Sequence, residues 1–235
     1  PGVRYSYIRP EIYLRYNLNG FLNLLEVMSE LRLNKLIYAS SSSVYGDAKN
    51  FPTNESSELK PLNLYGETKV INEQIAQIYS KYYNINSFGL RFFTAYGSLG
   101  RPDMMISKSI RKIKKKEIIY LYNHGNHTRD FTHVLDIAEI IFILSKKINV
   151  FKGHELFNIC SNNKIKLNYL IKSLEKLLRF KSITKNIKKQ KGDMLNTLGD
   201  NKKIKRFSKK KKFISFDFGL KETIKNDAER AKFKE

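Results

Sequence analysis

The sequence predicts an α/β fold in which a doubly wound, mostly parallel sheet precedes a smaller C-terminal part. Short apolar segments alternate with longer segments whose apolar residues recur at helical spacing. The first of the short segments, KLIYASS, is an apolar run that ends in small polar residues, as in a buried strand that stops at a polar edge. Two of them end in small or polar residues, ASSSS and RFFTAYG, and ligands of such sheets bind beyond the carboxyl ends of the strands. These two ends are therefore candidate site segments.

Helices and strands are expected to alternate along most of the chain. The first helix is predicted at residues 10–31, where apolar residues recur at helical spacing and a proline stands near the start. The same spacing predicts helices at 63–83, 102–116, 134–147 and 166–180. The strands are expected at 35–41, 85–93, 117–123 and 154–160. From residue 181 onward the sequence is basic and weakly patterned, with a last helix expected at 219–232.

Composition excludes several classes of protein. The chain has 235 residues, of which 41% are hydrophobic and 28% are charged, as in globular proteins of one or two domains. No apolar run approaches the ~20 residues that cross a bilayer, and residues 1–15 lack the pattern of a signal peptide. Cys160 is the only cysteine, which rules out an internal disulfide and is typical of a reducing compartment. We therefore expect a cytoplasmic protein without a membrane partner.

The formal net charge of +22 allows two interpretations. Lysines gather in RKIKKKE at 111–117 and in KKIKRFSKKKK at 202–212. Such runs are typical of surfaces that bind nucleic acids or anionic membranes, but also of a solvated surface in a lysine-rich protein. The runs contain almost no aromatic residues and match no nucleic-acid motif, which favours the solvated surface and no nucleic-acid partner. A basic chain would still attract an anionic substrate such as a nucleotide diphosphate.

Tyr65 and Lys69 are four residues apart in a predicted helix, so their side chains share one face. A phenol is a poor base while it is protonated, since its ordinary pKa is about 10. A nearby ammonium favours the phenolate, and a serine hydroxyl at a strand end can hydrogen-bond the same substrate hydroxyl. Such a set suits removal of a proton from an alcohol while hydride leaves its carbon, for which a nicotinamide cofactor is the acceptor.

The Tyr–Lys pair is weak evidence alone, because this spacing occurs by chance on many helices. Here the pair follows a serine cluster at a strand end by about 25 residues and precedes a second strand, GLRFF. The combination is far more specific than either part, and it favours dehydrogenase-type chemistry at the end of the strand at 35–41.

Four segments resemble the extended short-chain dehydrogenase/reductase family: YASSSSVYGD, PLNLYGETKVINE, GLRFFTAYGSLGRPDM and YNHGNHTRDFTHVLDI. Within it, the chain is most similar to the NAD-dependent epimerases and dehydratases of nucleotide sugars, and among these to the 4-epimerases of UDP-glucuronate. The resemblance extends to about residue 200. It implies an N-terminally truncated, Rossmann-like dinucleotide-binding domain at 1–95, to which 130–160 returns. A small C-terminal substrate-binding domain would comprise 96–129 and 161–235.

The resemblance implies roles for residues around the serine cluster. Tyr65 would be the catalytic base, and Lys69 would hold the nicotinamide ribose and lower the pKa of Tyr65. Ser41 falls where the family has its catalytic serine or threonine. Ser40 and Ser42 are either small packing residues or ligand contacts, Ser40 to the NAD cofactor and Ser42 to the substrate.

Five further residues match family positions near the cofactor or the substrate. Asn17 matches an asparagine near the cofactor, with a structural role as the alternative. Thr94 would contact the sugar or the diphosphate, and Arg101 would face the sugar carboxylate, for which a guanidinium fork is well shaped. Arg129 would bind the diphosphate, and Asp193 would reach the nucleotide ribose. For both arginines the alternative is a surface or interdomain ion pair. No metal is expected.

The implied reaction is 4-epimerisation of a UDP-sugar through transient oxidation at C4, with UDP-glucuronate and UDP-galacturonate as the expected pair. Family members that dehydrate or decarboxylate typically carry an acidic residue one or two places after the catalytic serine or threonine. Those places are Ser42 and Ser43 here, which favours simple epimerisation. A UDP-glucose 4-epimerase type, or another NAD-dependent sugar dehydratase, is the alternative. A uronate epimerase would usually feed surface polysaccharide biosynthesis.

The family begins with a strand, a Gly-rich turn and a helix that binds the cofactor pyrophosphate, but no G-x-x-G-x-x-G occurs in this chain. The opening PGVRYS matches a family segment after the third or fourth strand. We therefore expect a fragment that lacks roughly 80–90 upstream residues, or about three βα units of ~30 residues each. The alternatives are an inactive chain that serves as a binding subunit and a split gene. Family members are commonly homodimers, through a bundle that would include helices 10–31 and 63–83.

Overall fold

The computed structural model describes residues 2–3, 5–188 and 194–232. Its α-helices are α1 (Tyr5–Ile8), α2 (Pro10–Tyr13), α3 (Gly20–Glu30), α4 (Leu64–Tyr83), α5 (Met105–Lys114), α6 (Val134–Lys147), α7 (Leu167–Leu178), α8 (Lys202–Ser208) and α9 (Phe216–Lys232). Its strands are β1 (Lys35–Ser41), β2 (Asn86–Phe92), β3 (Thr94–Tyr96), β4 (Ile118–Tyr122), β5 (Thr128–His133), β6 (His154–Ile159), β7 (Lys164–Lys166) and β8 (Ile183–Ile187). Shorter turns of helix are η1 (Leu14–Asn19, a π-helix), η2 (Ser42–Tyr45) and η3 (Asn123–Gly125).

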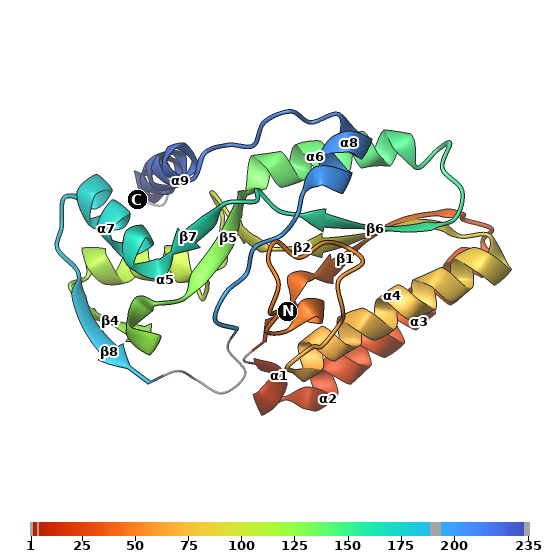
Figure 1. The fold of residues 1–235 in the computed structure, drawn as a ribbon, viewed down its shortest axis with the longest axis horizontal. Helices are drawn as coiled ribbons and strands as arrows, with labels where there is room; N and C mark the ends of the chain where they lie inside the picture. Colours follow the sequence, from red (N-terminus) through yellow and green to blue (C-terminus); the bar gives the residue numbers. More distant parts are fainter. Residues whose placement is uncertain (1, 4, 189–193, 233–235) are drawn as a thin grey trace.

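The larger part of the molecule is a parallel sheet in the order β1-β2-β6. Helices α3 and α4 run side by side along one face, and α6 covers the other (Figure 1). Two apolar clusters fill these layers. Toward α6 lie Phe88, Leu90, Ile140, Leu144, Phe157 and Ile159. Toward α3 and α4 lie Leu25, Met28, Leu36, Tyr38, Ala76 and Ile85. The predicted doubly wound α/β fold is confirmed.

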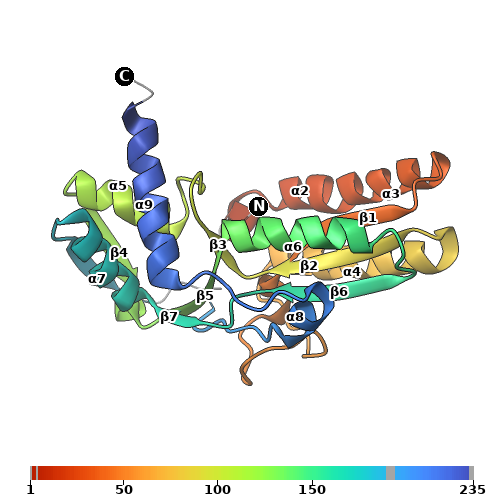
Figure 2. The ribbon, with the colours of Figure 1, turned by 90° about the horizontal axis from the view of Figure 1, so that it is seen from above.

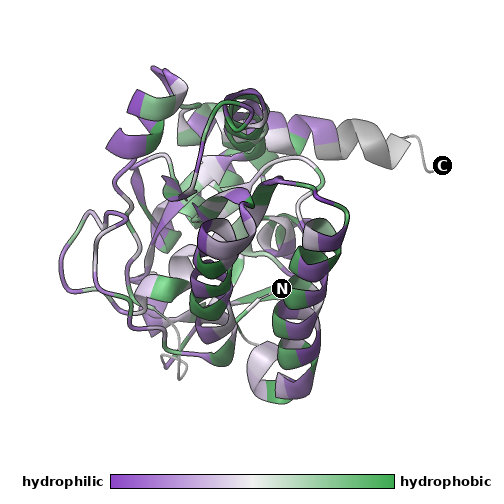
Figure 3. Ribbon diagram, turned by 90° about the vertical axis from the view of Figure 1, so that its right-hand side faces the viewer, coloured by the Kyte–Doolittle hydropathy of each residue, from purple (hydrophilic) through white to green (hydrophobic). Residues whose placement is uncertain are grey.

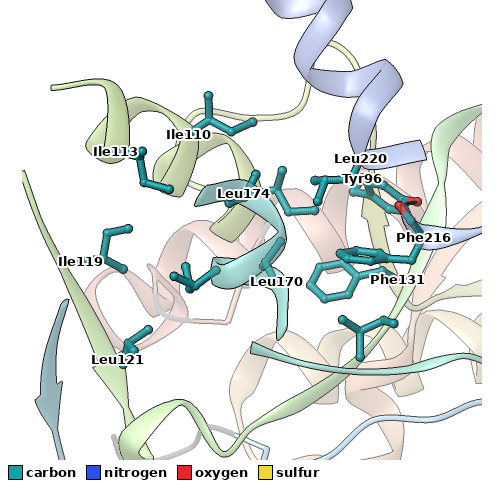
Figure 4. Packing of buried hydrophobic residues seen from close by; sticks show 13 residues of the cluster. Tyr96, Ile110, Ile113, Ile119, Leu121, Phe131, Leu170, Leu174, Phe216 and Leu220 are labelled. Atoms are coloured by element: carbon teal, nitrogen blue, oxygen red, sulfur yellow. Dashed lines mark hydrogen bonds between the residues drawn. The ribbon is translucent and has the colours of Figure 1, made fainter. Parts of the chain in front are cut away.

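The smaller part contains two short sheets, β4-β8 and β3-β5-β7. Of these strands, β3 and β5 lie on the side toward the large sheet (Figure 2). Its core is formed by side chains that converge from α5, α7, α9, β4 and β5 (Figure 4). They include Ile110, Ile113, Ile119, Leu121, Phe131, Leu170, Leu174, Phe216 and Leu220. The division of the chain into the two predicted domains stays a prediction.

Several elements differ from the prediction. The helix expected at 10–31 contains a π-helical segment at Leu14–Asn19. The helix expected from residue 102 begins at Met105, because the backbone of Met104 is still extended. The strand β5 was not expected, because its sequence TRDFTH lacks a continuous apolar run. The tail contains β8 and α8, which its polar, basic composition does not indicate.

One member of the lysine run at 202–212 is not solvated. The side chain of Lys210 is only 7% exposed, and its Nζ lies 2.9 Å from Oδ1 of Asp136 and 2.6 Å from Oε2 of Glu139. Asp136 also accepts the backbone N–H of Ile214. The expected solvated surface is therefore wrong at this residue, because the ion pair ties the tail to α6.

The open edge of β6 carries two carboxylates. The backbone N–H of Asn158 donates to Oε1 of Glu55 at 2.7 Å, and that of Leu156 donates to Oε1 of Glu155 at 3.2 Å. These N–H groups point away from β2, which pairs with the alternate residues of β6. Side chains thus satisfy donors that no neighbouring strand reaches in the described part of the chain.

The helices are amphipathic, as the alternation of purple and green along them shows (Figure 3). Within the described ranges, none of them combines the length and the apolar character that crossing a bilayer requires.

Candidate active site

The candidate site starts at the carboxyl end of β1. Ser41 is the last residue of that strand, and its Oγ accepts the backbone N–H of Ser43 at 3.1 Å. This contact caps the short turn η2, which carries Ser42 and Ser43 out of the sheet. The serine cluster therefore ends the strand and begins a turn, so that the Ser41 side chain is fixed at the polar end of the sheet.

Helix α4 begins against this turn. Its N-cap is Asn63, whose Oδ1 accepts the N–H of Gly66 at 2.9 Å. A Cβ at Gly66 would lie 2.8 Å from both the Cβ of Pro61 and the backbone oxygen of Ser43. Only glycine lets the helix approach so closely. The first turn of α4, which carries Tyr65, is thereby held beside the end of β1.

Tyr65 lies beside Ser41 and Arg101. Burial raises the pKa of the Tyr65 hydroxyl above its ordinary value, while a side-chain hydrogen bond with Ser41 and the charge of Arg101 lower it. The Nζ of Lys69 lies 5.9 Å from the centroid of the Tyr65 ring. The net direction is upward, because desolvation is the largest of these effects, and the lowering expected from Lys69 stays a prediction.

Lys69 lies one turn after Tyr65 and faces the same strand end. Its Nζ donates to the backbone oxygen of Ala39 in β1 at 2.9 Å. Burial lowers the pKa of the Lys69 ammonium, and the carboxylate of Glu73 raises it. The structure thus places Tyr65 and Lys69 on one helix face, as their spacing predicts, and brings both near Ser41.

A buried ion pair, which we did not predict, lies beneath these three residues. Arg91 of β2 and Glu73 of α4 pair through two hydrogen bonds, Nε to Oε1 at 2.9 Å and Nη2 to Oε2 at 2.7 Å. Ser40 donates its Oγ to the same Oε1 at 2.5 Å. The pair therefore joins the residue before Ser41 to the helix of Tyr65 and Lys69. Two features of the sequence indicate such a pair: an arginine among the apolar residues of a strand, and a glutamate one turn after Lys69.

The same network continues to the far edge of the sheet. Nη1 of Arg91 donates to the hydroxyl of Tyr45 at 2.9 Å and to the backbone oxygen of Glu55 at 3.0 Å. The Tyr45 hydroxyl donates to Oδ1 of Asn158 at 2.6 Å. Burial raises the pKa of Tyr45 to about 12, so the hydroxyl keeps its proton near neutral pH. Four segments of the chain are tied together here.

Arg101 reaches the site from the loop between β3 and α5. Its Nε donates to Oδ1 of Asp103 at 3.0 Å, and its Nη2 donates to Oδ2 at 2.7 Å. The hydrogen bond to Asp103 raises the pKa of Arg101, and Tyr65 and Tyr13 add to this. The rings of Tyr13 and Tyr65 meet edge to face with centroids 6.1 Å apart. A guanidinium, a phenol and a serine hydroxyl thus share one region.

The other predicted site residues contact segments around this region or lie outside the described residues. Asn17 lies in η1, and its Nδ2 donates to Oγ1 of Thr68 on α4 at 3.0 Å. Thr94 begins β3 and pairs with Phe131 of β5. Arg129 of β5 donates to the backbone oxygens of Thr128 and Leu195. Ser42 is partly buried in η2, and Asp193 lies outside the described residues. Their roles at cofactor or substrate stay predictions.

A comparison with family models decides the family. Residues 1–160 match the family described as "NAD dependent epimerase/dehydratase family", which is more than half of the chain. The chain belongs to the NAD-dependent epimerase/dehydratase family. The family's cofactor is NAD, as predicted.

Relatives of this epimerase/dehydratase chain act on nucleotide sugars. It is 34% identical over 225 residues to the UDP-glucuronate 4-epimerase of Thermodesulfobacterium geofontis, covering 95% of this chain and 68% of that protein. MoeE5 in complex with UDP-glucose and NAD superposes with a TM-score of 0.93 at 29% identity, over 98% of this chain and 77% of that one. For the UDP-glucuronic acid 4-epimerase from Bacillus cereus, in complex with UDP-glucuronic acid and NAD, the TM-score is 0.90 at 28% identity, over 98% and 73%. The chain spans about two thirds of the length of the curated relatives it matches.

The residues at the end of β1 fit the nicotinamide end of NAD. Lys69 presents an ammonium at the carboxyl end of the strand, where Nζ already donates to a backbone oxygen at 2.9 Å and has two further hydrogens for ribose hydroxyls. Ser41 and Tyr65 offer two hydroxyls near the same strand end. This donor set suits a sugar alcohol placed beside a nicotinamide.

Proposed function

We propose that this chain carries the catalytic centre of an NAD-dependent UDP-sugar 4-epimerase whose substrate is UDP-glucuronate and whose product is UDP-galacturonate. The observation that carries the proposal is that Ser41, at the end of β1, and Tyr65, in the first turn of α4, lie near each other, with Lys69 on the same helix face as Tyr65. The relatives named as UDP-glucuronate 4-epimerases support this choice of substrate.

The proposed proton transfer takes place at the C4 hydroxyl of the sugar. Tyr65 accepts this proton as its phenolate and returns it at the end of the reaction, while Ser41 hydrogen-bonds the same oxygen. NAD, when bound, supplies reversible hydride transfer at C4. Lys69 holds the nicotinamide ribose, and its positive charge favours the phenolate of Tyr65. Burial raises the pKa of Tyr65 in the chain alone. The positive charges near Tyr65 must therefore lower this pKa before the phenolate forms near neutral pH.

Arg101 is the proposed carboxylate-binding residue. Its side chain already pairs with a carboxylate through two parallel hydrogen bonds, the geometry that a uronate would require. Thr94 and Arg129 are proposed to contact the sugar and the diphosphate, and Asp193 the nucleotide ribose. Asn17 and Ser40 are proposed for the cofactor, and Ser42 for the sugar.

The test is a direct assay with two sugars. UDP-glucuronate or UDP-glucose is incubated with NAD and the protein, and the 4-epimer is followed by proton NMR of the anomeric signals. We expect UDP-galacturonate from the wild type and at least ~100-fold slower turnover for Tyr65→Phe, since a general base is lost. Tyr16→Phe, at an exposed tyrosine, is the matched control and should keep full activity.

The substrate assignment is tested by Arg101→Ala. Turnover of UDP-glucuronate should fall much more than turnover of UDP-glucose. Equal losses would favour the alternative, an enzyme of the UDP-glucose 4-epimerase type. Activity retained in Tyr65→Phe would exclude the proposed mechanism. An inactive wild type that binds UDP-sugars would favour a binding subunit.

We also propose that a second copy of the chain packs against α3 and α4. Leu24 and Val27 on α3, with Leu31 at its C-cap, form an exposed apolar stripe, and Ile71, Ile78 and Tyr82 form another on α4. The two helices pack together, so the stripes belong to one surface of the molecule (Figure 1). Light scattering should find a dimer that Ile78→Glu dissociates and Val150→Glu, at an exposed residue elsewhere, does not. A monomeric wild type would contradict the homodimer.

A further inference from the structure

The fork of Arg101 already holds a carboxylate that belongs to the protein. Asp103 receives both hydrogen bonds, from Nε at 3.0 Å and from Nη2 at 2.7 Å. This two-pronged arrangement is the one in which an arginine recognises a ligand carboxylate. The chain therefore presents, two residues from Arg101, a group that is chemically equivalent to the carboxylate of a uronic acid.

The pair lies close to the candidate catalytic tyrosine. The charge of Arg101 lowers the pKa of Tyr65, against the larger effect of burial. Nη2 of Arg101 would lie 3.4 Å from a Cβ at Gly2, whose backbone oxygen accepts the hydroxyl of Tyr13. Tyr13 in turn contacts the ring of Tyr65. A ligand that reaches Tyr65 therefore comes near the guanidinium.

The pair is also accessible to water. The side chain of Arg101 is 42% exposed and that of Asp103 is 67% exposed. Exposed ion pairs are held weakly, because water replaces either partner at little cost. Lys108 is a second cation that acts on Asp103 and lowers its pKa, so the released carboxylate would still have a favourable neighbour. Exchange of Asp103 for another carboxylate is thus physically easy.

We propose that Asp103 determines specificity by occupying the Arg101 fork until the carboxylate of a UDP-uronate displaces it, whereas a neutral UDP-hexose leaves the pair intact. The inference rests on the proposed function, in which Arg101 binds the sugar carboxylate. It adds Asp103 as a competitor of the substrate. A bound uronate gains an ion pair with Arg101, but the ion pair between Arg101 and Asp103 must first be broken. Affinity for the uronate is therefore lower than Arg101 alone would give, and affinity for the hexose is unaffected.

The first test compares two ligands on three variants. Binding of UDP-glucuronate and of UDP-glucose is measured by calorimetry, with NAD present, for the wild type, Asp103→Asn, Arg101→Ala and Glu11→Gln. Glu11 is the matched control, because it pairs with Arg9 across the same two-residue spacing and is similarly exposed. We expect Asp103→Asn to tighten UDP-glucuronate binding about three-fold and to change UDP-glucose binding less than two-fold. Glu11→Gln should change neither.

Three results would overturn the role of Asp103. Weaker binding of UDP-glucuronate by Asp103→Asn would mean that Asp103 orients Arg101 instead of competing for it. Equal tightening for both ligands would be a general effect of charge on the diphosphate. No change would mean that the pair does not exchange. The proposed function fails separately, if Arg101→Ala does not weaken UDP-glucuronate binding or the wild type binds neither ligand, and the inference then fails with it.

A second measurement needs no variant of the pair. The carboxyl carbon of Asp103 is observed by NMR while each ligand is added to the wild-type protein. Saturation with UDP-glucuronate should shift this resonance and raise the pKa of Asp103 toward its ordinary value, because the carboxylate loses the Arg101 partner. UDP-glucose should leave the resonance in place. A resonance unchanged at saturation with UDP-glucuronate would exclude displacement.

Discussion

Arg91–Glu73 and Arg101–Asp103 are built alike but lie in opposite surroundings. In each pair, Nε and Nη2 of the arginine donate to the two oxygens of one carboxylate. The side chains of the first pair are 2% and 5% exposed, and those of the second are 42% and 67% exposed. The first pair also binds neighbouring groups, including Ser40 and Tyr45.

The difference shows that burial decides whether an Arg–carboxylate pair is fixed or can exchange its partner. A buried charge that loses its partner stays in a medium of low dielectric constant, so neither member of the Arg91–Glu73 pair can leave. That pair fixes β2 against α4 and so the position of Lys69. A charge at the surface is compensated by water, so Arg101 can change partners. The predictions below test this contrast, from the largest expected effect to the smallest.

Removing one member of the buried pair should have the largest effect. Arg91→Ala leaves Glu73 buried and unpaired, which should lower the free energy of unfolding by about 3–5 kcal/mol. Urea titration followed by circular dichroism measures the loss. Arg9→Ala, which breaks an exposed pair with Glu11, is the control and should cost less than about 0.5 kcal/mol. Similar losses of unfolding free energy in both variants would contradict the contrast between the buried and the exposed pair.

A smaller loss is expected at the hydroxyl that extends the buried network. Tyr45→Phe removes the group that joins Arg91 to Asn158 and leaves Oδ1 of Asn158 without that donor. Unfolding should become easier by about 1–3 kcal/mol, because a buried acceptor is left unsatisfied. Thermal melting of Tyr45→Phe beside Tyr16→Phe, at an exposed tyrosine, measures the difference. Equal melting temperatures would show that the hydroxyl contributes nothing.

The exposed pair should contribute little to stability. Asp103→Asn is expected to change the free energy of unfolding by less than about 0.5 kcal/mol at neutral pH. Hydrogen bonding to Arg101 holds the pKa of Asp103 below its ordinary value, so the small contribution is present above about pH 4. It is lost as the pH falls below that value. Urea titrations of wild type and variant at neutral and acidic pH check the sign, and a loss above about 1.5 kcal/mol would mean that Asp103 is a structural residue.

The smallest effect is expected in the titration of Tyr65. Arg101→Ala removes a charge that lowers the pKa of Tyr65, so this pKa should rise further above its ordinary value. Asp103→Asn leaves the charge of Arg101 less compensated and should lower the pKa. Titration of the tyrosine ring carbons by NMR, with Tyr65→Phe to assign the signal, measures both shifts. Shifts of the same sign in the two variants would show that Arg101 does not act on Tyr65 through its charge.

The sequence predicts those elements and side-chain pairs that a pattern within one segment determines. The strand β2 is buried along almost its whole length, and its apolar residues show this. The side chains of β8 are almost all exposed, so this strand depends on its pairing with β4 and has no burial pattern to reveal it. In the site, Tyr65 and Lys69 share a helix and are recognised by spacing. The Arg91–Glu73 pair joins two elements, and no periodicity within either element predicts which charges meet.

The carboxylates along the open edge of β6 have a consequence for how copies of the protein meet. An uncovered strand edge is a template on which another chain can add a strand. Glu55 and Glu155 occupy the outward N–H groups of Asn158 and Leu156, and Glu155 also pairs with Lys203, so that edge offers an incoming strand few free donors. Through Glu55, the loop that follows η2 thus makes this edge of the sheet a poorer template for a strand from a second copy of the chain.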